Sequence, residues 1–223
     1  MFNNPEKKDV YILGAGNVAR DVFDIYRELG ISNHVKGFIE ENSEREGQEI
    51  EGVKIFSDSI LEKLDKKILL IAAIGLPTKQ FFIEKAAALD LNFDTIVHPN
   101  AIFGSRVTVE EGCIIFPGVF LTHDIKIGRH SIVNVGSNIS HDCTLGDFVT
   151  ISPGVNIAGK VTIENGTWIG IGATIINKIN IGQKTLIAAG AVVVGDIPDK
   201  VVAGGTPAKV IREWMNNDWE KVI

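Results

Sequence analysis

Aliphatic residues recur at every sixth position over the C-terminal half of the chain. Cut into hexads from Ala101 to Asp196, the sequence gives sixteen repeats without an insertion, and the third position is Val, Ile or Leu in fifteen of them. Gly, Asn and Asp recur at other positions, where they permit the backbone dihedrals of tight turns. The pattern predicts an all-β parallel β-helix shaped as a triangular prism, in which each hexad forms one side and three hexads form a coil. A sandwich of short antiparallel strands would instead show period-two alternation broken by longer turns.

The pattern before Pro99 is different, because short apolar runs alternate with helix-like segments. Strands are expected at 10–13, 35–39, 68–74 and 93–97, and helices at 18–29, 57–64 and 77–89. This alternating βα order predicts a small α/β domain with a Rossmann-like parallel sheet covered by helices.

The last segment of the chain follows the final hexad. Pro207 begins a predicted C-terminal helix that carries Val210, Ile211, Trp214 and Met215 at helical spacing and seals the last coil. We therefore expect three parts: an α/β domain at 1–99, a β-helix at 100–205 and a capping helix at 206–223.

Composition narrows the class of partner and the compartment. The net charge of −6 and the pI of about 5.4 argue against nucleic acid or an anionic membrane surface, since both require a basic face. The longest apolar stretch, at 68–76, is too short to span a bilayer. Cys113 and Cys143 lack the spacing of a metal site and fit a reducing compartment. We expect a soluble, cytoplasmic protein.

A glycine-rich loop lies between the first predicted strand and the first predicted helix. Residues 14–19, GAGNVA, satisfy the G-x-G-x-x-[GA] pattern, and Glu40 ends the next strand, where an acidic ribose contact belongs. The pattern alone indicates a dinucleotide, but a domain of this length lacks the second half of a dinucleotide fold. A single nucleotide is the more economical ligand, with its phosphate near the helix N-terminus. A tight turn without any ligand is the alternative.

The hexads followed by VVAGGTPAKVI resemble the hexapeptide-repeat acyltransferases. The order YILGAGN, AAIGLPTKQ and VHPNA before the hexads is similar to that of the NeuD/PglD-type sugar acetyltransferases of bacterial surface-glycan pathways. This resemblance implies a left-handed β-helix and a homotrimer with acetyl-CoA in the groove between neighbouring prisms. It also implies that the N-terminal domain holds a nucleotide-linked amino sugar.

The resemblance also assigns roles to residues. His141 and Asp142, in SNISHDCTLGDF, match the catalytic pair of the family, and the backbone amide of Gly159 matches its donor to the acetyl carbonyl. Thr150 stands where the family has a second histidine. The residues assigned to acetyl-CoA are Thr150, Gly159, Gly205, Pro207 and Lys209. The residues assigned to the sugar substrate are Gly14, Gly16, Asn17, Glu40, Gly75, His123 and Asn134.

These residue types suit acetyl transfer. Histidine can remove a proton near neutral pH, and an adjacent carboxylate can orient it. The Gly159 amide can stabilise the developing oxyanion, and direct attack in a ternary complex requires no acyl-enzyme. His123 occupies the same hexad position as His141 one coil earlier, so the two should be vertical neighbours. His141 alone is expected to have both a carboxylate partner and an oxyanion donor in register.

Three alternatives stay open at this point. A zinc site like that of carbonic anhydrase would need three or four ligands, and His130 falls at a different hexad position, so no metal is expected. The acceptor could be a hydroxyl, as in the sialic acid O-acetyltransferases of the family. The chain could also be a non-catalytic β-helix binding protein.

Overall fold

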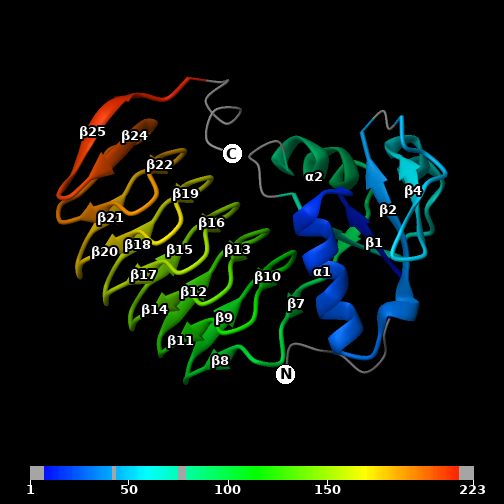
Figure 1. Cartoon of the computed structure of the whole chain (residues 1–223), viewed down its shortest axis with the longest axis horizontal. Helices are drawn as coiled ribbons and strands as arrows, with labels where there is room; N and C mark the ends of the chain where they lie inside the picture. The colour runs from blue at the N-terminus through cyan, green and yellow to red at the C-terminus, as the bar shows by residue number, and fades with distance from the viewer. Residues whose placement is uncertain (1–7, 42–43, 75–78, 216–223) are drawn as a thin grey trace. The chain divides into compact units, whose positions relative to one another are not determined.

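The computed structural model describes residues 8–41, 44–74 and 79–215 (Figure 1). The chain forms two compact units that divide between Val97 and His98. Each unit is described by itself below.

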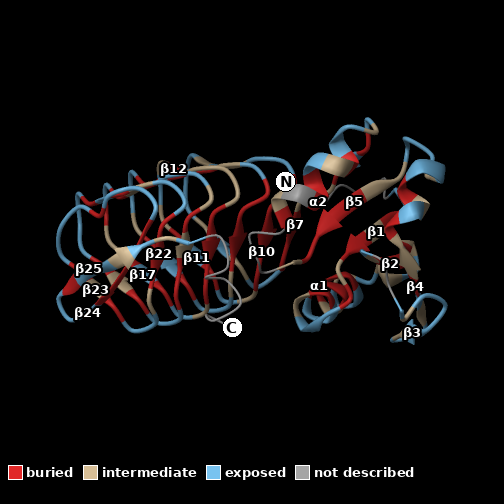
Figure 2. Ribbon diagram, turned by 90° about the horizontal axis from the view of Figure 1, so that it is seen from above, coloured by how far each residue is buried: buried red, intermediate tan, exposed pale blue. Residues whose placement is uncertain are grey.

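The N-terminal unit is built on one six-stranded sheet. Its strands are β1 (Val10–Leu13), β2 (Val35–Glu40), β3 (Glu49–Ile50), β4 (Val53–Ser57), β5 (Leu69–Ala72) and β6 (Asn92–Phe93), in the order β3-β4-β2-β1-β5-β6. The helices are α1 (Asn17–Glu28) and α2 (Lys79–Ala87), with 3-10 turns η1 (Ser32–His34) and η2 (Asp58–Lys63). The central strands β1 and β5 are almost wholly buried between α1 and α2, which lie on opposite faces of the sheet (Figure 2).

The sheet is mixed, so the purely parallel Rossmann-like sheet expected from the sequence is not what the chain forms. Strands β1, β2, β4, β5 and β6 pair in parallel, but β3 pairs antiparallel with β4. Glu51 and Gly52 form the two-residue turn between β3 and β4, both with positive φ (51° and 76°), as the right-handed twist of a hairpin favours. The segment predicted as a helix at 57–64 is the 3-10 turn η2, and the strand predicted at 93–97 is split between β6 and the later strand β7 (Ile96–Val97).

The C-terminal unit is a parallel β-helix with three sides. Within this unit the first side contains β10 (Ile114–Ile115), β13 (Ile132–Val133), β16 (Thr150–Ile151), β19 (Trp168–Ile169), β22 (Leu186–Ile187), β24 (Val201–Gly205) and β25 (Ala208–Glu213). The second side contains β8 (Ile102–Phe103), β11 (Phe120–Leu121), β14 (Asn138–Ile139), β17 (Asn156–Ile157), β20 (Thr174–Ile175) and β23 (Val192–Val193). The third side contains β9 (Val107–Val109), β12 (Ile125–Ile127), β15 (Thr144–Leu145), β18 (Thr162–Ile163) and β21 (Asn180–Ile181).

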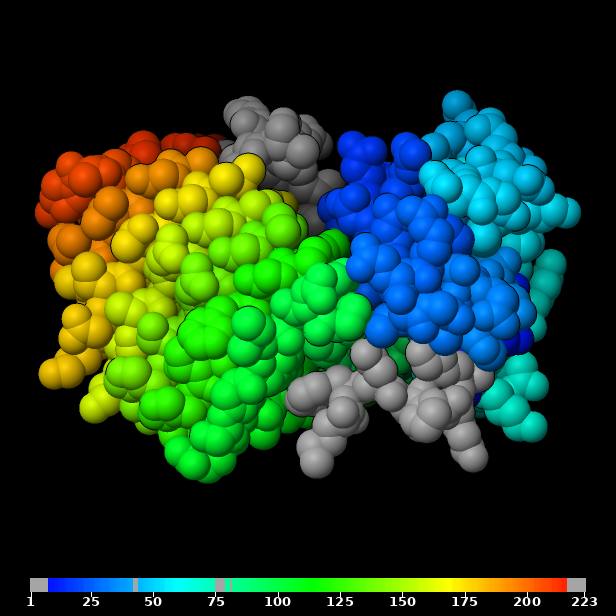
Figure 3. Space-filling view, turned by 60° about the horizontal axis from the view of Figure 1, so that its bottom comes forward, coloured from blue at the N-terminus to red at the C-terminus, as the bar shows by residue number. Residues whose placement is uncertain are grey.

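The strand register confirms the predicted coil of three hexads. Asn138 pairs with Asn156 on the second side, Thr144 with Thr162 on the third and Thr150 with Trp168 on the first, so each residue lies over the one 18 positions earlier. Consecutive coils therefore stack in sequence order (Figure 3). The third position of the hexads points inward, as predicted, and so does the first, where Cys113, Val119 and Val161 are fully buried.

The corners between sides use the left-handed backbone region. At the corner between the second and third sides, Asp124, Asp142 and Lys160 have φ of 57°, 58° and 61°. The N–H of Asp142 donates to the carbonyl of His123 at 3.1 Å, and the N–H of Lys160 donates to the carbonyl of His141 at 2.8 Å. These bonds between coils fix the height at which each corner side chain lies.

The predicted helix beginning at Pro207 is wrong for residues 208–213, which form strand β25. This strand pairs antiparallel with β24 and so provides hydrogen-bond partners for the backbone of the last strand of the first side. The apolar residues Val210 and Ile211, expected on one helix face, are exposed on this strand. Residues 216–223 of the predicted capping helix lie outside the described residues.

Candidate functional site

His141 and Asp142 lie together at the corner between the second and third sides. Nδ1 of His141 is 2.8 Å from Oδ2 of Asp142, and both side chains are about half exposed (47% and 46%). The carboxylate thus engages one ring nitrogen and leaves Nε2 as the nitrogen that can exchange a proton with a bound substrate. The structure therefore brings together the two residues that the sequence assigned to a catalytic pair.

The imidazole of His123 stacks on that of His141, as the hexad register predicted. The ring centroids are 5.4 Å apart and the ring planes differ by 12°. Nδ1 of His123 is also 2.8 Å from a carboxylate oxygen, Oδ2 of Asp124. The expectation that a carboxylate partner would distinguish His141 from His123 is therefore wrong. The signal was in the sequence, because Thr122-His123-Asp124 resembles Ser140-His141-Asp142 one coil earlier.

The two carboxylates of these pairs have different surroundings. Arg106 donates to both oxygens of Asp124, with Nε–Oδ1 of 2.5 Å and Nη2–Oδ2 of 2.7 Å. The Arg106 guanidinium, and to a smaller degree His123, hold the pKa of Asp124 well below its usual range. The sequence interpretation missed Arg106, although it occupies the same hexad position as Asp124 one coil earlier.

Gly159 lies against the other face of the His141 ring. A Cβ atom at position 159 would come within 2.6 Å of both Cε1 and Nε2 of His141, so a glycine is required here by close approach. The Gly159 carbonyl accepts a hydrogen bond from the N–H of Lys178 at 3.0 Å. Among the described residues, none accepts a hydrogen bond from the Gly159 N–H, which leaves this donor available beside the imidazole.

The remaining residues assigned to acetyl-CoA and sugar in the β-helix lie away from His141 within one chain. Thr150 is nearly buried in β16 on the first side. Asn134 follows β13 at the corner between the first and second sides, where its Oδ1 accepts the N–H of Val135 at 2.8 Å. Gly205, Pro207 and Lys209 lie in the hairpin between β24 and β25 at the end of the first side.

The glycine-rich loop lies at the carboxyl end of β1, directly before α1. Gly14 has φ of +99°, and its N–H donates to the carbonyl of Ile39 at 2.7 Å. Gly16 is the N-cap residue of α1 and contributes no side-chain cap, and Asn17 is the first helical residue. A Cβ on Gly14 would meet Ile74 and Ala73 at 3.0–3.1 Å, whereas a Cβ on Gly16 would meet nothing within 4 Å. The fold itself therefore requires glycine at position 14 but not at position 16.

Arg45 joins this loop to Glu40. Its Nε donates to Oε2 of Glu40 at 3.1 Å, its Nη2 contacts Oε1 of the same carboxylate, and Nη2 also donates to the carbonyl of Ala15 at 2.9 Å. The loop and the acidic residue are thus brought to the same edge of the sheet, as the sequence suggested. Arg45 itself was not foreseen, because it reaches this edge from the connection after β2. Gly75 lies outside the described residues.

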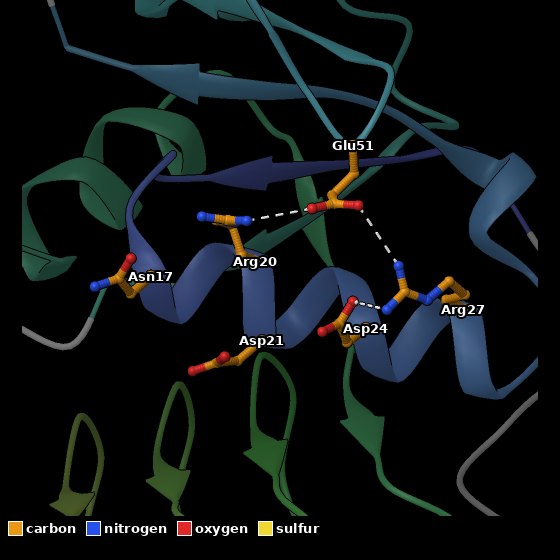
Figure 4. Close-up of a pocket in the computed structure, with 6 residues that line it drawn as sticks. All are labelled: Asn17, Arg20, Asp21, Asp24, Arg27 and Glu51. Atoms are coloured by element: carbon orange, nitrogen blue, oxygen red, sulfur yellow. Dashed lines mark hydrogen bonds and ion pairs between the residues drawn. The ribbon is translucent and has the colours of Figure 1, made fainter.

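A shallow cavity of about 240 Å³ lies on the exposed face of α1. Its lining residues are Asn17, Arg20, Asp21, Asp24, Arg27 and Glu51 (Figure 4). Arg20 and Arg27 both reach the Glu51 carboxylate, at 3.3 and 3.6 Å, and Arg27 also pairs with Asp24. Burial, followed by the charge of Asp24, raises the pKa of Asp21. Since the cavity is lined by mutually paired charges, and only Asn17 was assigned to a site, it adds no residue to the predicted centre.

Two other kinds of feature are absent from the described part of the chain. Within residues 8–41, 44–74 and 79–215, no group of three or more His, Cys, Asp or Glu side chains is placed to hold a metal ion. No helix among these residues is long and apolar enough to cross a membrane.

A three-sided parallel β-helix in hexad register is the architecture of the hexapeptide-repeat acyltransferases, and this chain belongs to that class of enzyme. No protein-family model matches the chain, and no match was found among curated proteins.

Solved structures do match. A variant of GDP-perosamine N-acetyltransferase from Caulobacter crescentus, in complex with CoA and GDP-perosamine, is 32% identical, with a TM-score of 0.84 over 91% of this chain and 96% of that one. The acetyltransferase domain of PglB from Neisseria gonorrhoeae is 26% identical, with a TM-score of 0.83 over 92% of this chain and 100% of that one. WeeI from Acinetobacter baumannii is 25% identical, with a TM-score of 0.84 over the same shares.

This chain belongs to the family of hexapeptide-repeat sugar acetyltransferases of the NeuD/PglD type, with a left-handed β-helix. The resemblance found in the sequence is thereby confirmed at the level of the family and of the enzyme class.

Proposed function

We propose that this enzyme transfers the acetyl group of acetyl-CoA to the amino group of a nucleotide-linked 4-amino-4-deoxy sugar in surface-glycan biosynthesis. The observation that carries the proposal is the corner at which the His141–Asp142 pair, with Nδ1–Oδ2 of 2.8 Å, lies directly beneath the bare backbone of Gly159. A base and an oxyanion donor are then adjacent. The similarity to sugar N-acetyltransferases solved with CoA or acetyl-CoA supports acetyl-CoA as the cosubstrate.

In the proposed reaction the amine nitrogen attacks the thioester carbonyl. Nε2 of His141 takes a proton from this nitrogen as the C–N bond forms, and Asp142 stabilises the imidazolium through Nδ1. The N–H of Gly159 stabilises the negative charge on the carbonyl oxygen. The tetrahedral intermediate then expels CoA as a thiolate, which accepts a proton, and the products are the N-acetyl sugar and CoA.

The nucleotide part of the sugar is assigned to the loop of Gly14, Gly16 and Asn17. The first N–H groups of α1 carry no side-chain cap, and such groups favour a phosphate. The open space at Gly16 leaves room for that phosphate to approach the backbone. Glu40 and its partner Arg45 lie at the same edge, where they would face the ribose and the phosphate.

The same proposal includes two further statements from the family. The enzyme acts as a homotrimer, with acetyl-CoA between neighbouring prisms. Thr150 and the β24–β25 hairpin, assigned to acetyl-CoA, and Asn134, assigned to the sugar, lie away from His141 within one chain. In a trimer they would reach the His141 of a neighbouring chain. The reaction takes place in the cytoplasm, which fits the thiols of Cys113 and Cys143, neither of which is in a disulfide.

The test is an acetyl-transfer assay that records thiol release from acetyl-CoA with a panel of UDP-, GDP- and dTDP-linked 4-amino sugars. At least one amino sugar should release CoA, with an N-acetylated product identified by mass spectrometry. If the enzyme acetylates sialic acid alone and gives an O-acetyl ester, the acceptor group is a hydroxyl and the proposed amine acceptor is wrong. Binding of both substrates without turnover would favour a non-catalytic binding protein.

The placement of the nucleotide is tested by Gly16→Leu, which the open space at this position allows to fold. The sugar KM should rise by about tenfold or more, because the leucine occupies the path of the phosphate, while the acetyl-CoA KM stays unchanged. Equal changes in both KM values would show that the nucleotide sugar does not bind at the loop of Gly14, Gly16 and Asn17.

A further inference from the structure

The proposed base does not stand alone at its corner. Arg106, the pair His123–Asp124, the pair His141–Asp142 and Gly159 occupy successive coils of one corner, and each contacts the next. Arg106 holds both oxygens of Asp124, Asp124 holds Nδ1 of His123, and the His123 ring lies flat against the His141 ring. Gly159 lies one coil after His141, and a Cβ atom at position 159 would come within 2.6 Å of that ring. His141 therefore has a close neighbour on the coil before it and another on the coil after it.

We propose that Arg106, Asp124 and His123 form a positioning unit that holds the His123 imidazole parallel to that of His141 and so fixes the direction of Nε2 of His141. This inference rests on the proposed function, because it takes His141 as the base. It assigns no contact with substrate to Arg106 or Asp124, which act through His123.

The carboxylates of the two histidine–aspartate pairs have different charged partners. Asp124 shares its carboxylate between His123 and the Arg106 guanidinium, so the charge of Arg106 offsets the attraction that Asp124 offers to a proton on His123. Asp142 instead forms its short contact with His141. The charged residues at this corner are Asp142 on the His141 coil, Asp124 and Arg106 on the two coils before it, and Lys160 and Lys178 on the two coils after it. A proton on His123 would oppose the imidazolium that His141 must become.

The geometry also restricts the ring mechanically. The His123 ring lies parallel to that of His141, with centroids 5.4 Å and planes 12° apart, so it limits how far His141 can tilt on that side, and Gly159 lies one coil after His141. A base must be within hydrogen-bond reach of its proton in a defined direction. Removing the His123 ring from beside His141 should therefore lower kcat more than it raises KM.

Four variants and a control test this unit. His123→Ala removes the ring that stacks on His141 and should lower kcat about tenfold with little change in either KM. His123→Phe restores a flat ring and should recover most of this loss.

Arg106→Gln leaves Asp124 wholly to His123, so His123 binds a proton more readily and kcat should fall about fivefold at pH values where that proton is bound. The loss should disappear at higher pH, and Arg106→Lys should restore kcat. Arg129→Gln is the control: it removes an exposed charge from a different corner, and kcat and both KM values should stay unchanged.

The control readout does not depend on catalysis. The histidine ring resonances, titrated by NMR with His141→Gln as the assignment variant, should show His123 taking up its proton at higher pH in Arg106→Gln than in the wild-type enzyme.

The inference would be overturned by kinetics of His123→Ala and Arg106→Gln that match Arg129→Gln at every pH, or by equal His123 titrations. An equal loss at all pH values in Arg106→Gln would also contradict the charge role. A wild-type enzyme that acetylates no sugar while the His123 titration still shifts would instead remove the proposed function and leave the electrostatic coupling in place.

Discussion

At the scale of single residues, the site depends on which neighbours lie one coil above and one coil below a side chain. His123 and His141 share a hexad position and a following aspartate, but only His141 has a glycine on its open face. Arg106 holds Asp124, the carboxylate of the lower pair. Two nearly identical sequence fragments therefore present different chemistry, and the following predictions separate them.

Replacing His141 by alanine should lower kcat by about 100-fold or more, because a general base contributes that much to proton transfer. The side chain is half exposed, so the urea midpoint of unfolding should change little. Steady-state kinetics and an equilibrium unfolding curve measure both. A variant that keeps near-normal kcat would remove His141 from the role of base.

Gly159→Ala should also reduce kcat strongly, although the backbone N–H is retained. The added methyl group would lie 2.6 Å from the His141 ring, so the imidazole must move from its slot, and a misplaced base costs on the order of 10²-fold. Gly195→Ala is the matched control, because it lies at the same corner two coils later and its Cβ would meet nothing within 4 Å. Similar kinetics for the two variants would show that the approach at Gly159 has no effect on catalysis.

The pairing of Asp124 predicts a pH dependence of stability. Its pKa is lowered in the folded state by Arg106 first and by His123 second. The stabilisation is therefore fully present above the unfolded pKa of about 3.9 and is lost as the pH falls through the folded pKa. The difference in urea midpoint between wild type and Asp124→Asn should be constant at about pH 5 and shrink below about pH 4. A difference that grows with acidification has the wrong sign.

At the scale of elements, each two- or three-residue strand of the β-helix is stabilised by the strands above and below it. The inward positions form continuous columns, such as Ile139, Ile157 and Ile175 on the second side, all nearly or fully buried. The outward positions are polar on the third side, and on the second side Asn138 and Asn156 join their side chains at 3.0 Å.

Neighbouring residues of β17 should accordingly respond very differently to alanine. Ile157→Ala removes a buried side chain and leaves a cavity, and should cost about 2–5 kcal/mol of unfolding free energy. Asn156→Ala removes two exposed side-chain hydrogen bonds, to Asn138 and to the carbonyl of Gly154, and should cost about 1 kcal/mol or less. Denaturant unfolding compares the two. Equal costs would contradict the inward and outward assignment of these positions.

At the scale of the whole molecule, apolar side chains stay exposed on the β-helix. Ile102 and Phe120 occupy adjacent outward positions on the second side and are 59% and 42% exposed. Ile171, at the corner between the first and second sides, is 61% exposed. Apolar area of this kind favours association with further copies of the chain.

Light scattering on the purified enzyme should therefore give about three times the chain mass of 24.2 kDa. Phe120→Glu places a charge in the apolar group and should shift the enzyme toward smaller species. A monomer at micromolar concentration would contradict both the trimer and an acetyl-CoA site shared between chains.

The hexad pattern alone was enough to predict the coil of the β-helix and the stacking of His123 and His141, and the resemblance it carries was enough to single out His141 and Asp142 as a pair. The physical reason is that a hexad repeat without insertions fixes the register of every strand, so positions 18 residues apart must stack. The tertiary structure alone decided the β3–β4 hairpin, the strand at 208–213, the reach of Arg45 to Glu40 and the bond between Arg106 and Asp124. These features depend on which backbone edges remain open and on how far long side chains extend once the chain has folded. Neither the open backbone edges nor the reach of the side chains can be predicted from local propensity or periodicity.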